Sequence, residues 1–108
     1  MSLNIEPAIG NFPAAGGKSI HNISNTTTNR LAFKVKTSSN ECYRVKPVFG
    51  FIEASAAIQF IIERLAGPPK EDKIVVQYAT VPAEETEPKA PFASGAQEGE
   101  VILKVKAQ

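Results

Sequence analysis

Alternation of apolar and polar residues is the feature of this sequence that most limits how the chain can fold. Leu31, Phe33 and Val35 share one face of residues 30–36, and the basic residues Arg30, Lys34 and Lys36 occupy the other. The same period of two recurs in three further segments, residues 42–46, 73–78 and 101–106. Successive side chains of a strand point to opposite faces, so these segments are predicted as half-buried strands, with weaker candidates at 5–9 and 21–23.

Turn-forming residues separate the alternating segments. They are the runs Ala-Ala-Gly-Gly at 14–17, Asn-Thr-Thr-Thr-Asn at 25–29 and Gly-Pro-Pro at 67–69. Short strands with turns at such spacing indicate an all-β sandwich or barrel. A length of 108 residues predicts one domain over residues 1–108.

The segment from residue 53 to 69 departs from the strand pattern. Its apolar residues at helical spacing are Ile58, Ile61, Ile62 and Leu65. Gly67 then suits the end of a helix. A strand would instead bury Phe60, but it would leave Ile61 outside and Arg64 out of pattern. The local sequence therefore favours a helix. Residues 82–99, which show no period, predict a long surface loop with one helical turn at 83–86.

Composition excludes several classes of protein. A net charge of +1 argues against a nucleic-acid-binding module. No segment reads as a signal peptide or as the ~20 apolar residues of a membrane span, so a cytoplasmic protein without membrane insertion is expected. The only thiol, Cys42, and the only histidine, His21, supply no disulfide, no zinc set and no nucleophile–base pair. The carboxylates lack metal-binding spacing, so no catalytic, metal or cofactor site is predicted and the chain is not expected to be an enzyme.

Basic residues at outward positions are the best candidates for a binding surface. They are Lys34, Lys36, Arg44, Lys46 and Lys73. If their strands are neighbours in one sheet, these side chains form a positive surface that suits an acidic peptide, with apolar contact from Val75. Lysines that simply populate solvent faces and protect sheet edges are the alternative.

The run "FKVKTSSNECYRVKPVFGFIE", followed by "KEDKIVVQYATVP", resembles the major sperm protein domain. This family includes nematode sperm cytoskeletal proteins and endoplasmic-reticulum adaptors, and the resemblance covers about residues 5–106. It implies a seven-stranded immunoglobulin-like sandwich in which residues 56–64 form a strand with Ile58, Phe60 and Ile62 in the core. It also implies that Pro47 marks a sharp bend between the sheets, with a cis peptide bond.

The resemblance also implies a site and a function. In the adaptor branch, residues matching Lys36, Thr37, Ser38 and Lys73 bind acidic phenylalanine-containing peptides. Val75 stands where that branch has a methionine, and Val48 where it has an asparagine. The short sperm-specific branch fits better, which implies a cytoskeletal interaction protein that contacts itself, as in a homodimer, or other domains of this family. A soluble module that binds acidic peptides is the alternative.

Overall fold

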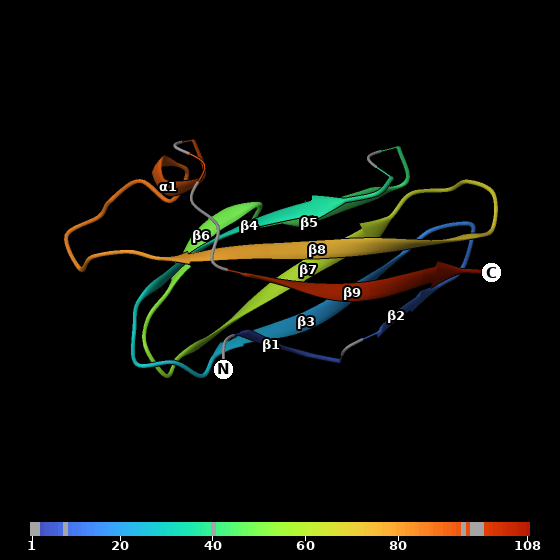
Figure 1. Cartoon of the computed structure of the whole chain (residues 1–108). Helices are drawn as coiled ribbons and strands as arrows, with labels where there is room; N and C mark the ends of the chain where they lie inside the picture. The colour runs from blue at the N-terminus through green and yellow to red at the C-terminus, as the bar shows by residue number, and fades with distance from the viewer. Residues whose placement is uncertain (1–2, 8, 40, 94, 96–98) are drawn as a thin grey trace.

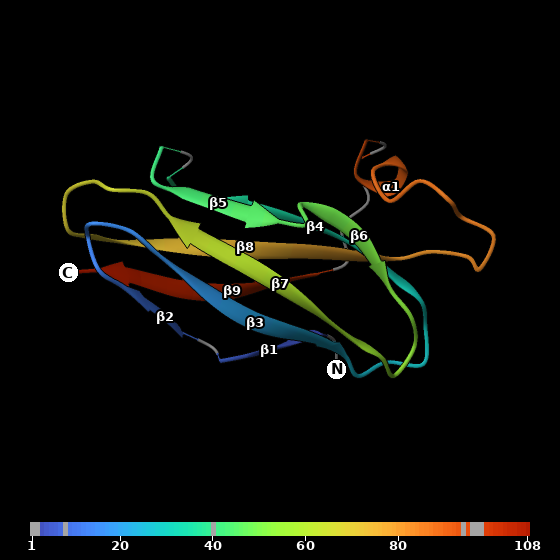
Figure 2. The same ribbon diagram turned by 180° about the vertical axis from the view of Figure 1, so that it is seen from behind.

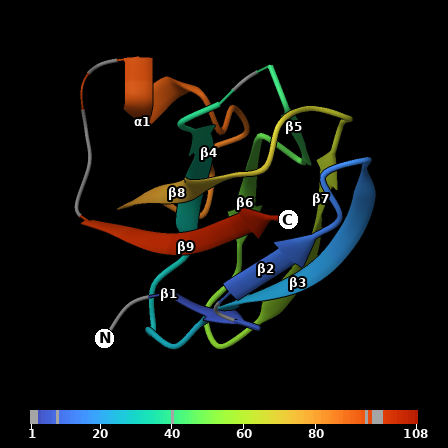
Figure 3. The same ribbon diagram turned by 90° about the vertical axis from the view of Figure 1, so that its right-hand side faces the viewer.

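Two β-sheets stacked face to face form the protein in the computed structural model, which describes residues 3–7, 9–39, 41–93, 95 and 99–108 (Figures 1 and 3). The four-stranded sheet has the order β1 (Leu3–Glu6), β3 (Gly17–Asn25), β7 (Ala57–Arg64) and β5 (Tyr43–Lys46). The five-stranded sheet has the order β2 (Ile9–Phe12), β9 (Gly99–Ala107), β8 (Lys70–Thr80), β4 (Leu31–Thr37) and β6 (Phe49–Ile52). Among these strands only β2 and β9 pair in parallel.

The core lies between the two sheets and confirms the predicted all-β sandwich. In β4, Leu31, Phe33 and Val35 are buried and Lys36 is exposed, as the alternation predicts. The facing sheet contributes Phe60, which is fully buried. Burying one large apolar side chain contributes about 1.5–3 kcal/mol, so the inward faces of both sheets supply the main driving force for folding.

The described residues form nine strands rather than the predicted seven. The difference arises where the chain passes from the four-stranded sheet to the five-stranded sheet. β1 passes into β2 after the Glu6–Pro7 bond, and β5 passes into β6 after the Lys46–Pro47 bond, and both peptide bonds are cis. A proline has no N–H for the strand ladder, so each crossing interrupts a strand. If β1 with β2, and β5 with β6, are each counted as one bent strand, the total is seven.

Residues 57–64 form a strand, so the helix that local spacing favours for this segment is wrong. β7 lies between β3 and β5 and pairs with both, which satisfies its backbone on two sides. Phe60 and Ile62 are buried, while Ile61 is 42% exposed on the outer face. Arg64 is buried and its Nη2 donates to the Pro68 carbonyl at 2.7 Å. Pairing with two neighbours therefore outweighs helical periodicity.

The loop after β8 also differs from the prediction. The helical turn expected at residues 83–86 is wrong, because this stretch holds a tight turn closed by the Glu85 N–H and the Pro82 carbonyl, at 3.1 Å. The short helix α1 spans Ala90–Ala93 instead. Residues 94 and 96–98 of the predicted loop lie outside the described residues. Loop and helix sit at one end of the molecule, and the C-terminus lies at the other (Figures 1 and 2).

Arg30 fixes this loop against the sandwich. Its Nη1 donates to the carbonyls of Pro82, Ala83 and Glu85 at 3.1, 3.3 and 2.7 Å. Its Nε donates to Glu53 at 2.9 Å, and its Cζ lies 3.9 Å from the centre of the Phe51 ring. A guanidinium held on several sides has little freedom, so it orders the loop backbone.

Asn25, the last residue of β3, connects two loops through the hydrogen bonds of its side chain. Its side chain is 2% exposed, and its amide nitrogen donates to the carbonyls of Asn29, Ile52 and Glu53 at 2.8, 3.0 and 3.1 Å. Its Oδ1 accepts from the Thr27 N–H and hydroxyl at 2.9 and 2.7 Å. A buried amide with both ends satisfied connects the β3–β4 turn to the chain that leaves β6.

We predict that Asn25→Asp is strongly destabilising. The new carboxylate would place a buried oxygen against three carbonyl oxygens, at a cost of about 3 kcal/mol or more. Gln59→Glu, at an exposed position of β7 opposite the uncharged Asn22, makes the same amide-to-carboxylate change and should stay within about 0.5 kcal/mol of wild type. Urea denaturation of both variants is the measurement, and equal midpoints would contradict the role given to Asn25.

Candidate protein-interaction surface

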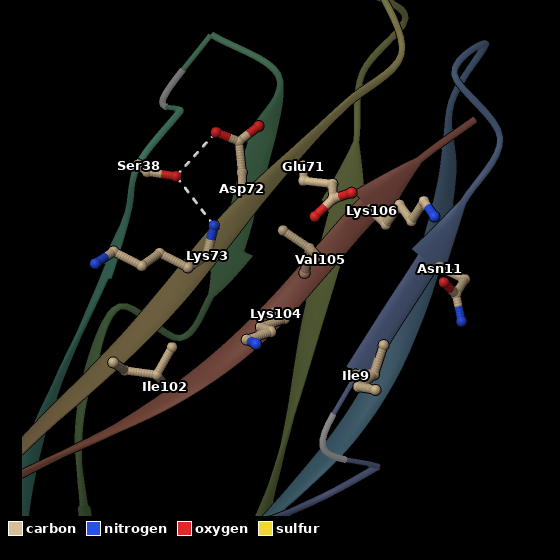
Figure 4. A pocket seen from close by; sticks show the side chains of 10 residues that line it. All are labelled: Ile9, Asn11, Ser38, Glu71, Asp72, Lys73, Ile102, Lys104, Val105 and Lys106. Atoms are coloured by element: carbon tan, nitrogen blue, oxygen red, sulfur yellow. Dashed lines mark hydrogen bonds between the residues drawn. The ribbon is translucent and has the colours of Figure 1, made fainter.

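A groove of about 750 Å³ lies on the outer face of the five-stranded sheet (Figure 4). It crosses β2, β9 and β8, and Ser38 closes one side just after β4 ends. Its lining consists of Ile9, Asn11, Ser38, Glu71, Asp72, Lys73, Ile102, Lys104, Val105 and Lys106. We call it the outer-face groove.

Strand register decides which side chains meet in and beside this groove. Two neighbouring rows of register partners are Ile9–Lys104–Lys73 and Ile102–Val75–Lys36. Ile9 is 56% and Ile102 is 48% exposed, so two large apolar side chains face solvent on this side of the sheet. Val75 is half-buried between Ile102 and Lys36. Apolar residues and lysines therefore alternate as direct neighbours across these strands.

Lys73 and Lys104 form an uncompensated pair of like charges. They stand directly opposite one another on β8 and β9, where side chains of one face lie close together. Neither ammonium has an ion-pair partner among the residues that the structure describes. Like charges at such positions oppose strand pairing, and an anion placed between them would remove that cost.

The groove also contains two carboxylates, Glu71 and Asp72. Asp72 Oδ1 accepts from the Ser38 hydroxyl at 2.9 Å, and its Oδ2 lies 3.7 Å from Lys70 Nζ. Glu71 is the register partner of Lys106 on the same face. Neither carboxylate is the register partner of Lys73 or Lys104, so these two lysines face each other across β8 and β9.

A second, smaller hollow of about 390 Å³ lies between β4 and β5, at an edge of the sandwich. Its lining consists of Val35, Lys36, Thr37, Tyr43, Arg44, Val45 and Val48. The Val35 N–H donates to the Val48 carbonyl at 2.8 Å, so the β4 edge is partly occupied here. This edge hollow combines two exposed cations, Lys36 and Arg44, with an apolar floor.

The predicted binding residues fall into separate groups. Ser38 and Lys73 line the outer-face groove, whereas Lys36, Thr37 and Arg44 line the edge hollow. Lys34 lies beside the Phe49 ring, with 5.8 Å from its Nζ to the ring centre.

The predicted basic surface required its strands to be neighbours in one sheet, and only some of them are. Lys34, Lys36 and Lys73 share the five-stranded sheet, but Arg44 and Lys46 lie on β5 of the other sheet. Alternation gave the outward side of each strand correctly, but it contains no information on which strands become neighbours.

Sequence reasoning missed Ile9, Ile102, Lys104 and Lys106 as members of the site. The alternation at 101–106 already placed the last three on an outward face. Their pairing opposite β8 is what brings them beside Lys73. The parallel pairing of β2 with β9, which adds Ile9, has no local sequence signal.

The other reactive side chains are used by the fold. His21 is fully buried; its Nδ1–H donates to the Pro7 carbonyl at 2.8 Å, which leaves Nε2 to accept from the Ser19 hydroxyl at 2.7 Å. Cys42 is buried in the core cluster. Within the described part of the chain, no group of three or more His, Cys, Asp or Glu side chains could hold a metal ion. No helix there is long and apolar enough to cross a membrane.

Comparison with known proteins gives consistent matches over nearly the whole chain. The family model described as "MSP (Major sperm protein) domain" matches residues 2–101. Sperm-specific class P protein 34 of Caenorhabditis elegans is 60% identical over 97% of this chain and 98% of that protein. The solved structure of WR4, a C. elegans MSP family member, has a TM-score of 0.97 at 59% identity and covers 100% of both chains. That of SSP-19, from the same organism, has a TM-score of 0.93 at 40% identity, over 97% of this chain and 98% of that one.

We predict that Lys104→Glu stabilises the fold. It turns the Lys73–Lys104 repulsion into an opposite-charge pair, a gain of about 0.2–1 kcal/mol. Lys106→Glu is the matched control, because it places a glutamate opposite Glu71 and should lower stability by a similar amount. Thermal unfolding of both variants at low salt checks this, and a shift of the same sign in both would contradict it.

Proposed function

Because this chain belongs to the major sperm protein domain family, we propose that it is a non-enzymatic interaction protein of the nematode sperm cytoskeleton, located in the cytoplasm. It acts through protein–protein contacts, either with further copies of itself, for example as a homodimer, or with other domains of this family. The observation that carries the proposal is the outer-face groove, where exposed Ile9 and Ile102 lie beside the unpaired cations Lys73 and Lys104.

Two further observations support this function. The sperm-specific class P protein reported above comes from a nematode and is matched over 98% of its own length. Exposed isoleucines on a charged face suit a protein contact, because their burial is favourable and the surrounding charges select the partner. The buried His21 and Cys42 are positioned to stabilise the sandwich rather than to react with a substrate.

We predict that the outer face of the five-stranded sheet binds sperm filaments. The double variant Lys36→Asp/Lys73→Asp should co-pellet with filaments from nematode sperm about tenfold less than wild type, since it reverses two charges of this face. Lys18→Asp, on the outer face of the other sheet, is the control and should co-pellet normally. Wild-type protein that stays in the supernatant would sink the proposed function.

A peptide-recognition module is the second candidate function. The row Ile102–Val75–Lys36 lies beside the row that contains Lys73, so apolar and basic groups are available together for an extended acidic peptide with a phenylalanine. The edge hollow with Thr37 and Arg44 could hold a neighbouring part of the same peptide. Val48, 44% exposed at this hollow, offers only apolar contact.

Titration with an acidic phenylalanine-containing peptide at low salt tests this second function. We predict that Lys73→Asp weakens binding about tenfold, whereas Lys18→Asp leaves it unchanged. Isothermal calorimetry gives both affinities. If Lys73→Asp binds the peptide as well as wild type does, the peptide-recognition function is wrong.

A further inference from the structure

We propose that the outer-face groove of one copy of this chain binds the acidic loop, residues 82–89, of a second copy, so that copies join head to tail. The inference rests on the proposed function, specifically on self-association, and it names the two surfaces that meet. The groove supplies Lys73 and Lys104 together with exposed isoleucines, and the loop supplies carboxylates.

The acidic loop presents two carboxylates to solvent. Glu84 is exposed and has no hydrogen-bond or ion-pair partner among the described residues. Glu87 is exposed, and its Oε1 accepts only one backbone N–H, from Lys89 at 3.3 Å. Glu85 differs, because its Oε2 already accepts from the backbone of Thr86 and Glu87 at 3.2 and 3.3 Å.

Lys89, the single cation of residues 82–89, does not neutralise the exposed carboxylates Glu84 and Glu87. Lys89 Nζ lies over the Phe49 ring, 5.3 Å from its centre, and is thus turned toward the body of the protein. Arg30 is committed to Glu53 and to three loop carbonyls. These carbonyl contacts hold the loop in place before any partner arrives, which lowers the entropy lost on binding.

The groove carries the positive charge that complements the acidic loop. Lys73 and Lys104 repel each other across β8 and β9, and a carboxylate from outside can lie between them. Ile102, beside this pair, can pack against Pro82, Ala83 and Pro88 of the loop sequence "PAEETEPK". Charge and apolar contact therefore match the same eight-residue segment.

A loop cannot reach the groove of its own chain. Lys73 and the loop are connected by the extended strand β8, and the eight steps along the chain from Lys73 to Val81, just after β8 ends, span about 26 Å. Arg30 also holds the loop at the end of the molecule opposite the C-terminus (Figures 1 and 2). Contact between these two surfaces must therefore be between two molecules.

Such a contact uses different surfaces on the two copies. It leaves one groove and one loop unoccupied in every dimer, so further copies can add until a ring closes or an open chain forms. The contact involves one loop and one groove and is therefore weak and sensitive to salt. The Debye length falls from about 30 Å at 0.01 M salt to about 8 Å at 0.15 M, so association is strongest in dilute buffer.

Sedimentation velocity on two neutralised variants tests the proposal. The groove variant is Lys73→Gln/Lys104→Gln, and the loop variant is Glu84→Gln/Glu87→Gln. At about 0.01 M salt, where exposed charges interact over the longest range, wild type should form oligomers that dissociate as salt is added. Each variant alone should associate about tenfold more weakly. The control variant Lys18→Gln/Lys46→Gln removes two positive charges from the other sheet and should behave as wild type does.

Mixing the two variants is the decisive step. The groove variant keeps an intact loop and the loop variant keeps an intact groove, so the equimolar mixture should form dimers, and no larger species, with near wild-type affinity. Wild-type protein that stays monomeric, variants that associate normally, or a mixture that fails to dimerise would each overturn the proposal. If wild-type protein never self-associates but binds an acidic peptide in the groove, the proposal is wrong and the groove binds a peptide instead. Filament co-pelleting by a monomeric wild type would overturn this inference and leave the proposed function standing.

Discussion

The pairing of β8 with two neighbours is the constraint on which both the core and the outer face depend. β8 pairs with β4 on one side and with β9 on the other. These two registers place Ile74 and Val76 in the core, and they place Lys73 opposite Lys104 on the outside. A slip by one residue would exchange the two faces, exposing isoleucine and burying lysine. The core therefore fixes the geometry of the groove.

Much of the fold follows from local sequence, and the exceptions share one physical cause. Alternation correctly gave the inward residues of β4 and the outward position of Lys73 on β8. For β7 the local spacing wrongly favoured a helix, because pairing with β3 and β5 outweighs that helical pattern. Local sequence also could not assign Arg44 to a sheet, since the crossing at Pro47 depends on contacts distant in sequence. Which strands become neighbours depends on the whole chain. The local sequence therefore predicted outward-facing residues of the site but not which of them lie together.

The outer face of the five-stranded sheet departs from what stability alone would favour. A cross-strand lysine pair and two isoleucines near half exposure both lower the stability of an isolated molecule, and each could be replaced without changing the backbone. Local conflicts of this kind are expected where a surface serves a purpose other than folding. The buried amide of Asn25 shows the contrasting case, in which every polar atom is satisfied within the chain.

The outer face of the four-stranded sheet offers a direct comparison, because its described strand registers place no two like charges directly opposite each other. Ile20 and Ile61 are exposed register partners there, at 58% and 42%, so apolar surface alone does not distinguish the two faces. Charge does, because Glu63 stands between Lys18 and Arg44, and each cation of that row already faces a carboxylate. Lys46 continues the isoleucine row as the register partner of Ile61, so a single cation lies beside exposed isoleucines on that face as well. The directly opposed lysines Lys73 and Lys104 are thus what distinguishes the five-stranded sheet, and they are the reason for proposing it as the face that binds a partner.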